Sequence, residues 1–239
     1  MFLYAILGSL LAIASASKEI ILTPKNSLLI RGQINAATAT DFIYEVNKRS
    51  KKEGLYLYLD TNGGSVDAGN KIINEITKYN ISCVAERAIS MGFVILQSCN
   101  NRYITPSATL MQHQMSYGVV NEKEKVESYV QFIKQIGDQL TTMQANRIGI
   151  SAQEFQERTY NDWWIFGGNG VNENCADDIA SVKCNTKLTN LTYTIDYAGN
   201  SYLFSYCPLI NGPVQIKPKS KSSKSTRRYY ENSIGDVYL

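Results

Sequence analysis

The chain has 239 residues, 44% of them hydrophobic, which is typical of a soluble globular protein with one substantial domain and short appendages. Its formal net charge is only +3, which argues against nucleic-acid binding as the main task. One histidine in the whole sequence leaves almost no ligands for a zinc site, and we expect neither a metal nor another cofactor.

The N-terminus predicts a secretory signal peptide over residues 1–16. An apolar run over 2–14 ends in the small residues Ala14-Ser15-Ala16, which fit a signal-peptidase site. The run is shorter than a typical transmembrane helix, but no lysine or arginine precedes it, so a retained membrane anchor is the main alternative. We therefore expect an exported protein, in the periplasm, outside the cell or in a secretory compartment, rather than a cytoplasmic one.

Strand and helix patterns alternate between residues 28 and 114. We expect strands over 28–34, 55–60, 81–85, 102–104 and 109–114, and helices over 37–52, over 66–76 and from Ser90 onward. The stretch Thr61-Asn62-Gly63-Gly64 is expected to end the second strand. This order predicts an α/β fold of repeated βαβ units around a largely parallel sheet, with ligand sites at the carboxyl ends of its strands.

The longest periodic stretch is 122–147, whose apolar stripe predicts one helix of about seven turns. A helix of that length in a domain of this size is expected to project or to support assembly. Ser151 and Glu154 form a capping box that predicts the start of the next helix. Residues 193–197 and 202–206 predict a β-hairpin within an appended segment, 185–212.

Residues 213–239 are expected to form a flexible basic tail. The stretch KPKSKSSKSTRR is rich in serine and basic residues and contains no acid, a composition that cannot form a packed core. The alternative to a solvated tail is one that binds a membrane surface or a partner.

The five cysteines show no CxxC spacing. In an exported protein we expect a disulfide among Cys175, Cys184 and Cys207, which lie in loop-like or edge segments. The sequence does not give the pairing. The odd number leaves at least one thiol free or paired with another chain.

Three residues are candidates for nucleophilic catalysis. Ser90 lies where a strand gives way to an apolar helix, a turn that can expose a hydroxyl beside helix N–H groups. His113 ends a strand and is the only imidazole that can serve as its base. Asp162 precedes two tryptophans and is expected to be partly buried, where it can orient the histidine. The alternatives are a small packing serine, a structural or surface histidine, and a turn or helix-cap aspartate.

A fourth feature is Asn62-Gly63-Gly64-Ser65-Val66, between a strand and a helix. Paired glycines let backbone N–H groups approach a ligand oxygen, as an oxyanion hole requires. A phosphate-binding loop is an alternative, but neither the P-loop pattern nor the dinucleotide-binding glycine pattern occurs. A plain tight turn is the simplest alternative.

Five segments resemble, in the same order, the proteolytic subunit of Clp-type serine proteases: DTNGGSVDAG, AISMGFVIL, LMQHQ, YNDWW and NGVNENCADDI. The corresponding family patterns are roughly SPGGSVxAG, AASMGAxLL, MIHQP, RDxF and YGLVDxI. The resemblance runs from about residue 18 to residue 184 with similar spacing. It implies a peptidase domain over 17–184 with the Clp-protease/crotonase-like fold.

The resemblance also implies a serine endopeptidase that hydrolyses peptides or unfolded proteins. By motif, Ser90 is the nucleophile, His113 the general base and acid, and Asp162 the orienting carboxylate, while the N–H groups of Gly64 and Met91 form the oxyanion hole. The helix over 122–147 resembles the family's handle helix, which implies homo-oligomeric rings. An ATP-driven unfoldase of the AAA+ class is implied as a partner only if the protein is cytoplasmic.

The chain departs from the family pattern at several places. Asn62 stands where the family has proline, Met115 stands where a second proline follows the histidine motif, and residues 173–178 replace the usual ending. The hairpin, the basic tail and the signal peptide have no counterpart. Three other functions stay open: a crotonase-like thioester enzyme, a catalytically silent scaffold, and, as a minor alternative, a Ser/Lys enzyme.

Overall fold

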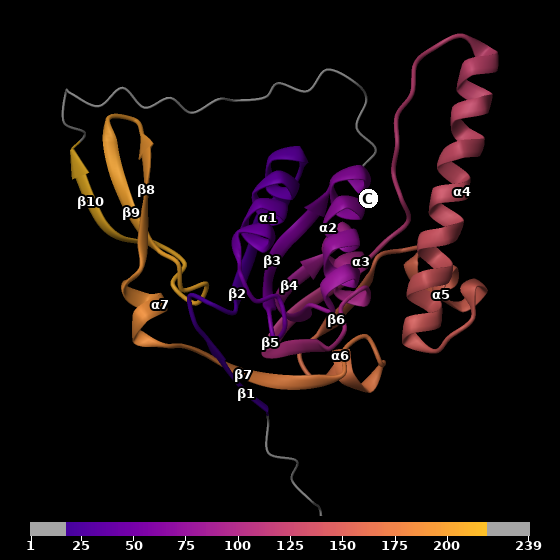
Figure 1. Ribbon diagram of the computed structural model, residues 1–239. Coiled ribbons are helices and arrows are strands. Elements are labelled where there is room, and N and C mark those ends of the chain that lie inside the picture. Colours follow the sequence, from indigo (N-terminus) through magenta and orange to yellow (C-terminus); the bar gives the residue numbers. More distant parts are fainter. Residues whose placement is uncertain (1–17, 219–239) are drawn as a thin grey trace, which may run out of the picture.

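The computed structural model describes residues 18–218, which form two sheets and seven helices (Figure 1). The larger sheet has the order β1-β7-β5-β4-β3-β2, with β6 paired to β5 off this path. Every pair in it is parallel except β5–β6. Its strands are β1 (Lys18–Leu22), β2 (Ser27–Ile34), β3 (Tyr56–Gly64), β4 (Ser82–Ile89), β5 (Arg102–Gln112), β6 (Trp163–Phe166) and β7 (Asp178–Cys184).

Helices follow the parallel strands as the alternating pattern predicts. They are α1 (Ala36–Lys48), α2 (Val66–Tyr79), α3 (Met91–Gln97), α4 (Lys123–Ile148), α5 (Ala152–Thr159), α6 (Asn169–Asn172) and α7 (Thr186–Asn190). The smaller sheet is antiparallel and contains β8 (Thr192–Tyr197), β9 (Asn200–Ser205) and β10 (Pro213–Pro218). The predicted α/β fold with a largely parallel sheet and an appended hairpin is therefore confirmed.

Polar side chains fix the start of four of the described helices, including α7, where Asn185 Oδ1 accepts from the Leu188 N–H at 2.8 Å. Asn35 and Ser65 accept hydrogen bonds from N–H groups of the first turns of α1 and α2. Ser151 Oγ accepts from the Glu154 N–H at 3.0 Å, which confirms the predicted start of α5. The first turns of these helices are thus set by local sequence.

The sheet separates two apolar cores. The first lies between the sheet and α1–α3 and is extended by α4 and α5. The second lies on the other face of the sheet and is smaller. Alternation along β3 places Leu57 and Leu59 in the first core and Tyr58 in the second.

The long helix α4 projects from the body of the molecule, as expected (Figure 1). It has 26 residues, of which only Ile133, Gln144, Ala145 and Ile148 are buried. Its C-terminal half packs on α3 and α5. The N-terminal half leaves apolar side chains such as Phe132, 55% exposed, in solvent.

Three boundaries differ from the sequence-based expectation. The Thr61–Gly64 stretch does not end β3, because Gly63 and Gly64 still pair with Gln33 and Ile34. Residues 102–112 form one strand instead of two. Residues 213–218 form β10 on the edge of the hairpin, not the beginning of a flexible tail. The signal peptide predicted over 1–16 and the rest of the tail lie outside the described residues.

Two disulfides are present among the described residues, Cys83–Cys99 and Cys184–Cys207, and Cys175 is a buried free thiol. The second disulfide is one of those expected. The first was not foreseen, because only the packing of α3 on β4 brings Cys99 beside Cys83, with 5.8 Å between their Cα atoms. None of the described helices combines the length and the apolar character that a membrane span needs.

Candidate active site

Ser90 occupies a strained turn between β4 and α3. Its backbone has φ 60° and ψ −121°, a conformation that costs a non-glycine residue about 1–3 kcal/mol. The turn is held because the Ser90 N–H donates to the Met111 carbonyl at 2.8 Å, while the Ser90 carbonyl accepts from Phe93 at the start of α3. Ser90 is 3% exposed, and its side chain makes no cap hydrogen bond to the helix. The hydroxyl is therefore free for another partner.

That partner is His113, directly after the end of β5. Its Nε2 lies 2.9 Å from Ser90 Oγ. The backbone N–H of His113 donates to Gln112 Oε1 at 3.1 Å, and Gln112 Nε2 in turn donates to Gln144 Oε1 of α4. Because β4 and β5 are neighbouring parallel strands, their carboxyl ends meet and bring the predicted nucleophile and base into hydrogen-bond contact.

Asp162 does not reach this pair. The structure corrects the expectation that it is partly buried: Asp162 is exposed, has φ 55°, and makes no hydrogen bond or ion pair among the residues from 18 to 218. Only the first of the two tryptophans turns inward, since Trp163 is 9% and Trp164 58% exposed. The β5–β6 register nevertheless pairs Gln112 with Trp163, so its continuation by one residue sets Asp162 opposite His113.

Of the two glycines, Gly63 lies against the serine turn and Gly64 lies against β2. A Cβ atom at Gly63 would lie 2.7 Å from Ser90 Cβ and 2.9 Å from the Met91 nitrogen. At Gly64 it would lie 2.2 Å from the Ile34 carbonyl oxygen, on the side of β2. Both glycines have positive φ, 92° and 145°. Met91 opens α3, so its N–H has no acceptor within the helix.

A groove of about 720 Å³ begins at His113 and runs between α4 and α5. Its lining mixes apolar and neutral polar side chains with a few charged ones. The lining includes Gln112, His113, Gln114, Met115, Leu140, Gln144, Phe155 and Tyr160. Sequence reasoning did not find this groove, because its walls come from segments far apart in the chain.

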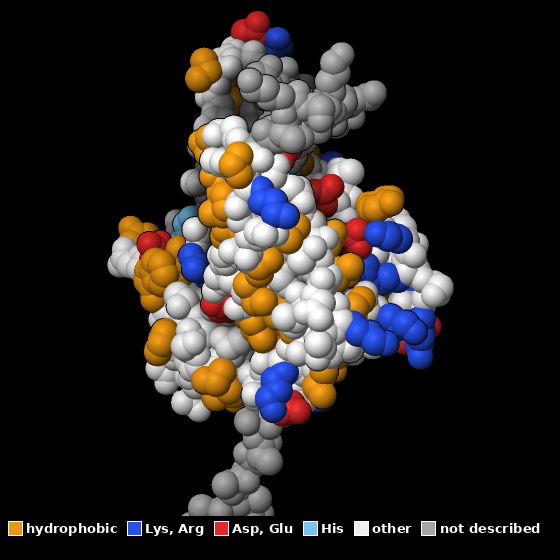
Figure 2. Space-filling model, turned by 90° about the vertical axis from the view of Figure 1, so that its left-hand side faces the viewer, with side chains coloured by type: hydrophobic (Ala, Val, Ile, Leu, Met, Phe, Trp, Pro, Cys, Tyr) orange, Lys and Arg blue, Asp and Glu red, His pale blue; other side chains and the backbone are white. Residues whose placement is uncertain are grey.

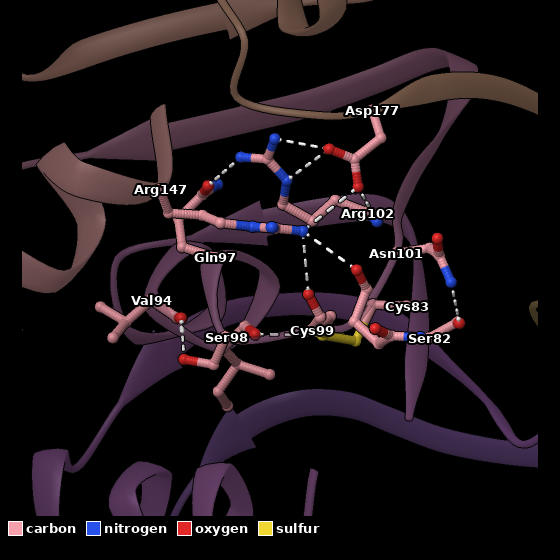
Figure 3. Close-up of a disulfide and its surroundings, with 12 residues drawn as sticks. Ser82, Cys83, Val94, Gln97, Ser98, Cys99, Asn101, Arg102, Arg147 and Asp177 are labelled. Atoms are coloured by element: carbon pink, nitrogen blue, oxygen red, sulfur yellow. Dashed lines mark hydrogen bonds and ion pairs between the residues drawn. A yellow bond between two sulfur atoms is a disulfide. The ribbon is translucent and has the colours of Figure 1, made fainter. Parts of the chain in front are cut away.

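The other end of α3 is anchored by a buried charge network (Figure 3). The Arg102 side chain is 3% exposed and bonds Asp177 at 2.6 Å and Gln97 Oε1 at 2.7 Å. Arg147 of α4 donates to the Cys99 and Asn100 carbonyls. Burial disfavours the Asp177 carboxylate, but hydrogen bonds and the charge of Arg102 outweigh it and hold the pKa of Asp177 below its ordinary value. The network ties α3 to α4 and to the segment before β7.

Comparisons with known proteins identify the family of the chain. The family model of the Clp proteases matches residues 13–183. The "ATP-dependent Clp protease proteolytic subunit 2" of Tropheryma whipplei (strain Twist) is 28% identical over 143 residues, which cover 56% of this chain and 77% of that relative. The match to the family model, over residues 13–183, includes the serine turn, the histidine strand and the long helix, and it ends before the appended sheet. The chain thus belongs to the Clp protease family, a family of peptidases.

Proposed function

We propose that the protein is a serine endopeptidase that cleaves peptides or unfolded proteins through an acyl-enzyme. The observation that carries the proposal is the 2.9 Å contact between Ser90 Oγ and His113 Nε2 at a strained strand-to-helix turn. Strain of this kind persists where function requires a side chain to be held in one position. The family match supports the same reaction class.

In this mechanism the hydroxyl of Ser90 donates to His113 Nε2, which takes the proton as Oγ attacks the scissile carbonyl carbon. The protonated imidazole then gives the proton to the leaving amine, and an acyl-enzyme on Ser90 remains. Water attacks the ester with His113 again as the base, which frees the second product and restores the serine.

The oxyanion that forms during attack needs two N–H donors. Met91 supplies one, because its N–H at the start of α3 has no acceptor within the helix. Gly64 is the second donor that the family motif implies. Gly63, with no side chain, leaves the space beside Ser90 Cβ and the Met91 nitrogen open.

Asp162 is the third member of the proposed triad. Its place opposite His113 in the continued β5–β6 register supports this role, and its exposed carboxylate must turn toward His113 Nδ1 to fill it. We propose that assembly of subunits into a ring brings about this rearrangement, since the exposed apolar part of α4 favours a homo-oligomer. An AAA+ unfoldase is a partner only in a cytoplasmic setting.

We also propose that the protein works in an oxidising compartment. The two disulfides support this, because such bonds persist in secreted and periplasmic proteins and are rare in the cytosol. Sequencing the N-terminus of the protein purified from its natural source tests the export proposal: a start at residue 17 supports it, and an intact residue 1 contradicts it.

The central experiment combines activity and labelling. Ser90→Ala should lower cleavage of casein or a fluorogenic peptide by about 10⁴-fold or more and abolish labelling by a fluorophosphonate. Ser98→Ala is the matched control, because Ser98 lies at the other end of α3 and, among residues 18–218, its hydroxyl bonds only the Val94 carbonyl and the Met143 sulfur. Equal activity of Ser90→Ala and the parent would refute the proposal.

A catalytically silent scaffold is the second candidate. The exposed, unpaired Asp162 favours it, because a histidine without its carboxylate is a weaker base. A folded oligomer that shows neither cleavage nor fluorophosphonate labelling of Ser90 would decide for the scaffold.

A further inference from the structure

The small sheet, which lies outside the family match, has one apolar face. Residues directly opposite each other in a sheet share a face, and successive residues along a strand alternate between the two faces. Ile195 of β8, Tyr202 of β9 and Ile216 of β10 therefore lie in one row. We call this surface the aromatic face, and its large apolar side chains are Tyr193, Ile195, Tyr197, Tyr202, Phe204 and Ile216.

The opposite face of the same strands is mainly polar, with Leu203 as its one large apolar side chain. Asp196, Ser201 and Lys217 form one row of it, in which Ser201 Oγ donates to Asp196 Oδ1 at 2.6 Å. Asp196 is also the only acidic residue of the three strands. The small sheet is therefore amphipathic, and its acid lies on the face opposite to the aromatic one.

The rest of the described chain, residues 18–218, does not bring the aromatic face into an apolar core. None of its six large side chains belongs to the first or the second core. Tyr197 is 73% and Ile216 56% exposed, and the other four are half-buried, in part by contacts with each other. Figure 2 views the molecule from the side on which Figure 1 places the small sheet, and it shows hydrophobic side chains over this surface. The aromatic face is thus open apolar surface.

A run of basic residues follows the sheet directly. No acid occurs between Asp196 and Glu231. Because Pro218 of β10 pairs with Asn200, beside the turn that joins β8 to β9, the chain leaves β10 at the end of the sheet where Tyr197 lies. The positive charge therefore begins at the border of the aromatic face. We call residues 217–228 the basic stretch, and its charged residues are Lys217, Lys219, Lys221, Lys224, Arg227 and Arg228.

We propose that the aromatic face and the basic stretch together bind the surface of a membrane that contains anionic lipids. Tyrosine has an apolar ring and a polar hydroxyl, and it is enriched where hydrocarbon meets water in membranes. Clusters of about four to eight lysines and arginines beside an apolar anchor are attracted to anionic headgroups. One such signal alone gives weak and reversible binding, whereas two together give stable attachment. The proposal does not depend on the peptidase reaction.

The size of the aromatic face favours a membrane over a folded protein as its partner. Three strands of six residues, about 4.8 Å apart and rising about 3.3 Å per residue, cover about 300 Å². A stable protein–protein interface buries about 800 Å² on each partner. A bilayer requires less apolar area here, because each basic residue near an anionic surface strengthens binding by about fivefold.

Co-sedimentation with lipid vesicles tests the proposal. The chain is used from residue 17, its expected mature start, because the apolar run over 2–14 would bind lipid by itself. Vesicles of phosphatidylcholine with about 30% phosphatidylglycerol should bind the protein about 100-fold or more tightly than pure phosphatidylcholine vesicles. Binding to the anionic vesicles should weaken steeply when NaCl is raised to about 0.5 M, because salt screens the attraction.

Two pairs of variants separate the contributions of charge and apolar surface. Lys219→Gln/Lys221→Gln should weaken binding to the anionic vesicles by about 25-fold. Its control, Lys25→Gln/Lys51→Gln, makes the same change in net charge at two exposed lysines of the peptidase part and should bind like the parent.

The second pair of variants lies on the small sheet. Tyr197→Ser/Ile216→Ser should weaken binding to the anionic vesicles by about tenfold, because less apolar surface enters the bilayer. Its control, Thr194→Ser/Gln215→Ser, changes exposed residues on the opposite face of the same strands and should have no effect.

Three results would overturn the proposal. Equal binding to anionic and neutral vesicles would exclude the charge-dependent attachment. Equal weakening by the two lysine double variants would show that only net charge matters and not the basic stretch. If Tyr197→Ser/Ile216→Ser lowers the mass of the oligomer in light scattering but leaves vesicle binding unchanged, the aromatic face is a contact between copies of the chain.

Discussion

Cys83 and Cys99 are joined on either side of Ser90, and we predict that this disulfide holds the strained turn. The sequence separation of 16 gives a loop-closure contribution of about 3 kcal/mol to the free energy of unfolding. Both sulfur atoms are buried, so Cys83→Ala/Cys99→Ala also loses about 1 kcal/mol of packing for each. The double variant should therefore be about 4–5 kcal/mol less stable than the parent in urea unfolding.

The effect on Ser90 follows from the strain. A backbone at φ 60° is kept only where its surroundings force it, and α3 is held both by the disulfide and by Arg147. The strained backbone of Ser90 costs about 3 kcal/mol at the upper end of the range. If the disulfide offsets half of this cost, its loss lowers the population of the reactive turn by about tenfold. The rate of fluorophosphonate labelling of Ser90 should fall by that factor at a temperature where circular dichroism shows the variant to be folded.

Cys184→Ala/Cys207→Ala is the matched control for this experiment. Its separation of 23 gives a nearly equal loop-closure contribution, about 3 kcal/mol, but its disulfide lies far along the chain from Ser90. It should lower the stability without slowing the labelling. Equal labelling rates in the parent and in a folded Cys83→Ala/Cys99→Ala variant would refute the reasoning.

Three further predictions concern the neighbourhood of the site. Asp177→Asn should lower the free energy of unfolding by about 2 kcal/mol at pH 7, because it leaves the buried Arg102 without its carboxylate partner. The loss is smaller than for a fully buried ion pair, because the Asp177 side chain is 35% exposed. Since the pKa of Asp177 is lowered on folding, urea titrations should show this difference shrinking as the pH falls below about 4. Gly63→Ala should abolish fluorophosphonate labelling, because its Cβ has no space and φ is 92°, whereas Gly212→Ala, with open space around it, should label normally. Burial raises the pKa of the Cys175 thiol to about 12, so iodoacetamide should leave it unmodified at pH 8 in the folded protein and modify it in urea.

Much of the fold is present in local sequence. The apolar periods predicted the alternating order of strands and helices between residues 28 and 114, and Ser151 with Glu154 predicted the start of α5. The predicted helix over 122–147 agrees with α4 to within a residue at each end. These features follow from short-range preferences and burial periodicity, which are read within a few residues of the chain.

The site was predicted as a set of residue types and not as a geometry. Ser90 and His113 were identified by sequence, but their contact depends on β4 and β5 lying side by side. The exposed position of Asp162 could not be read from its neighbours, because the two tryptophans behind it face opposite sides of β6. The sequence identified Gly63 only as one of two adjacent glycines. Its close contact with Ser90 is a feature of the tertiary structure.

By itself, the sequence determined the alternating strands and helices between residues 28 and 114, the long helix, the start of α5 and the β8–β9 hairpin, together with the serine and histidine that meet at the strand ends. Only the tertiary structure decided the Cys83–Cys99 pairing, the groove between α4 and α5, the third strand β10, and the seat of residues 186–211 on the second core. The physical reason is the range of the interactions. Apolar periodicity and helix capping act within one or two turns of the chain. Disulfide pairing, the shape of the groove and the packing of residues 186–211 on the sheet depend instead on which distant strands the sheet places next to each other.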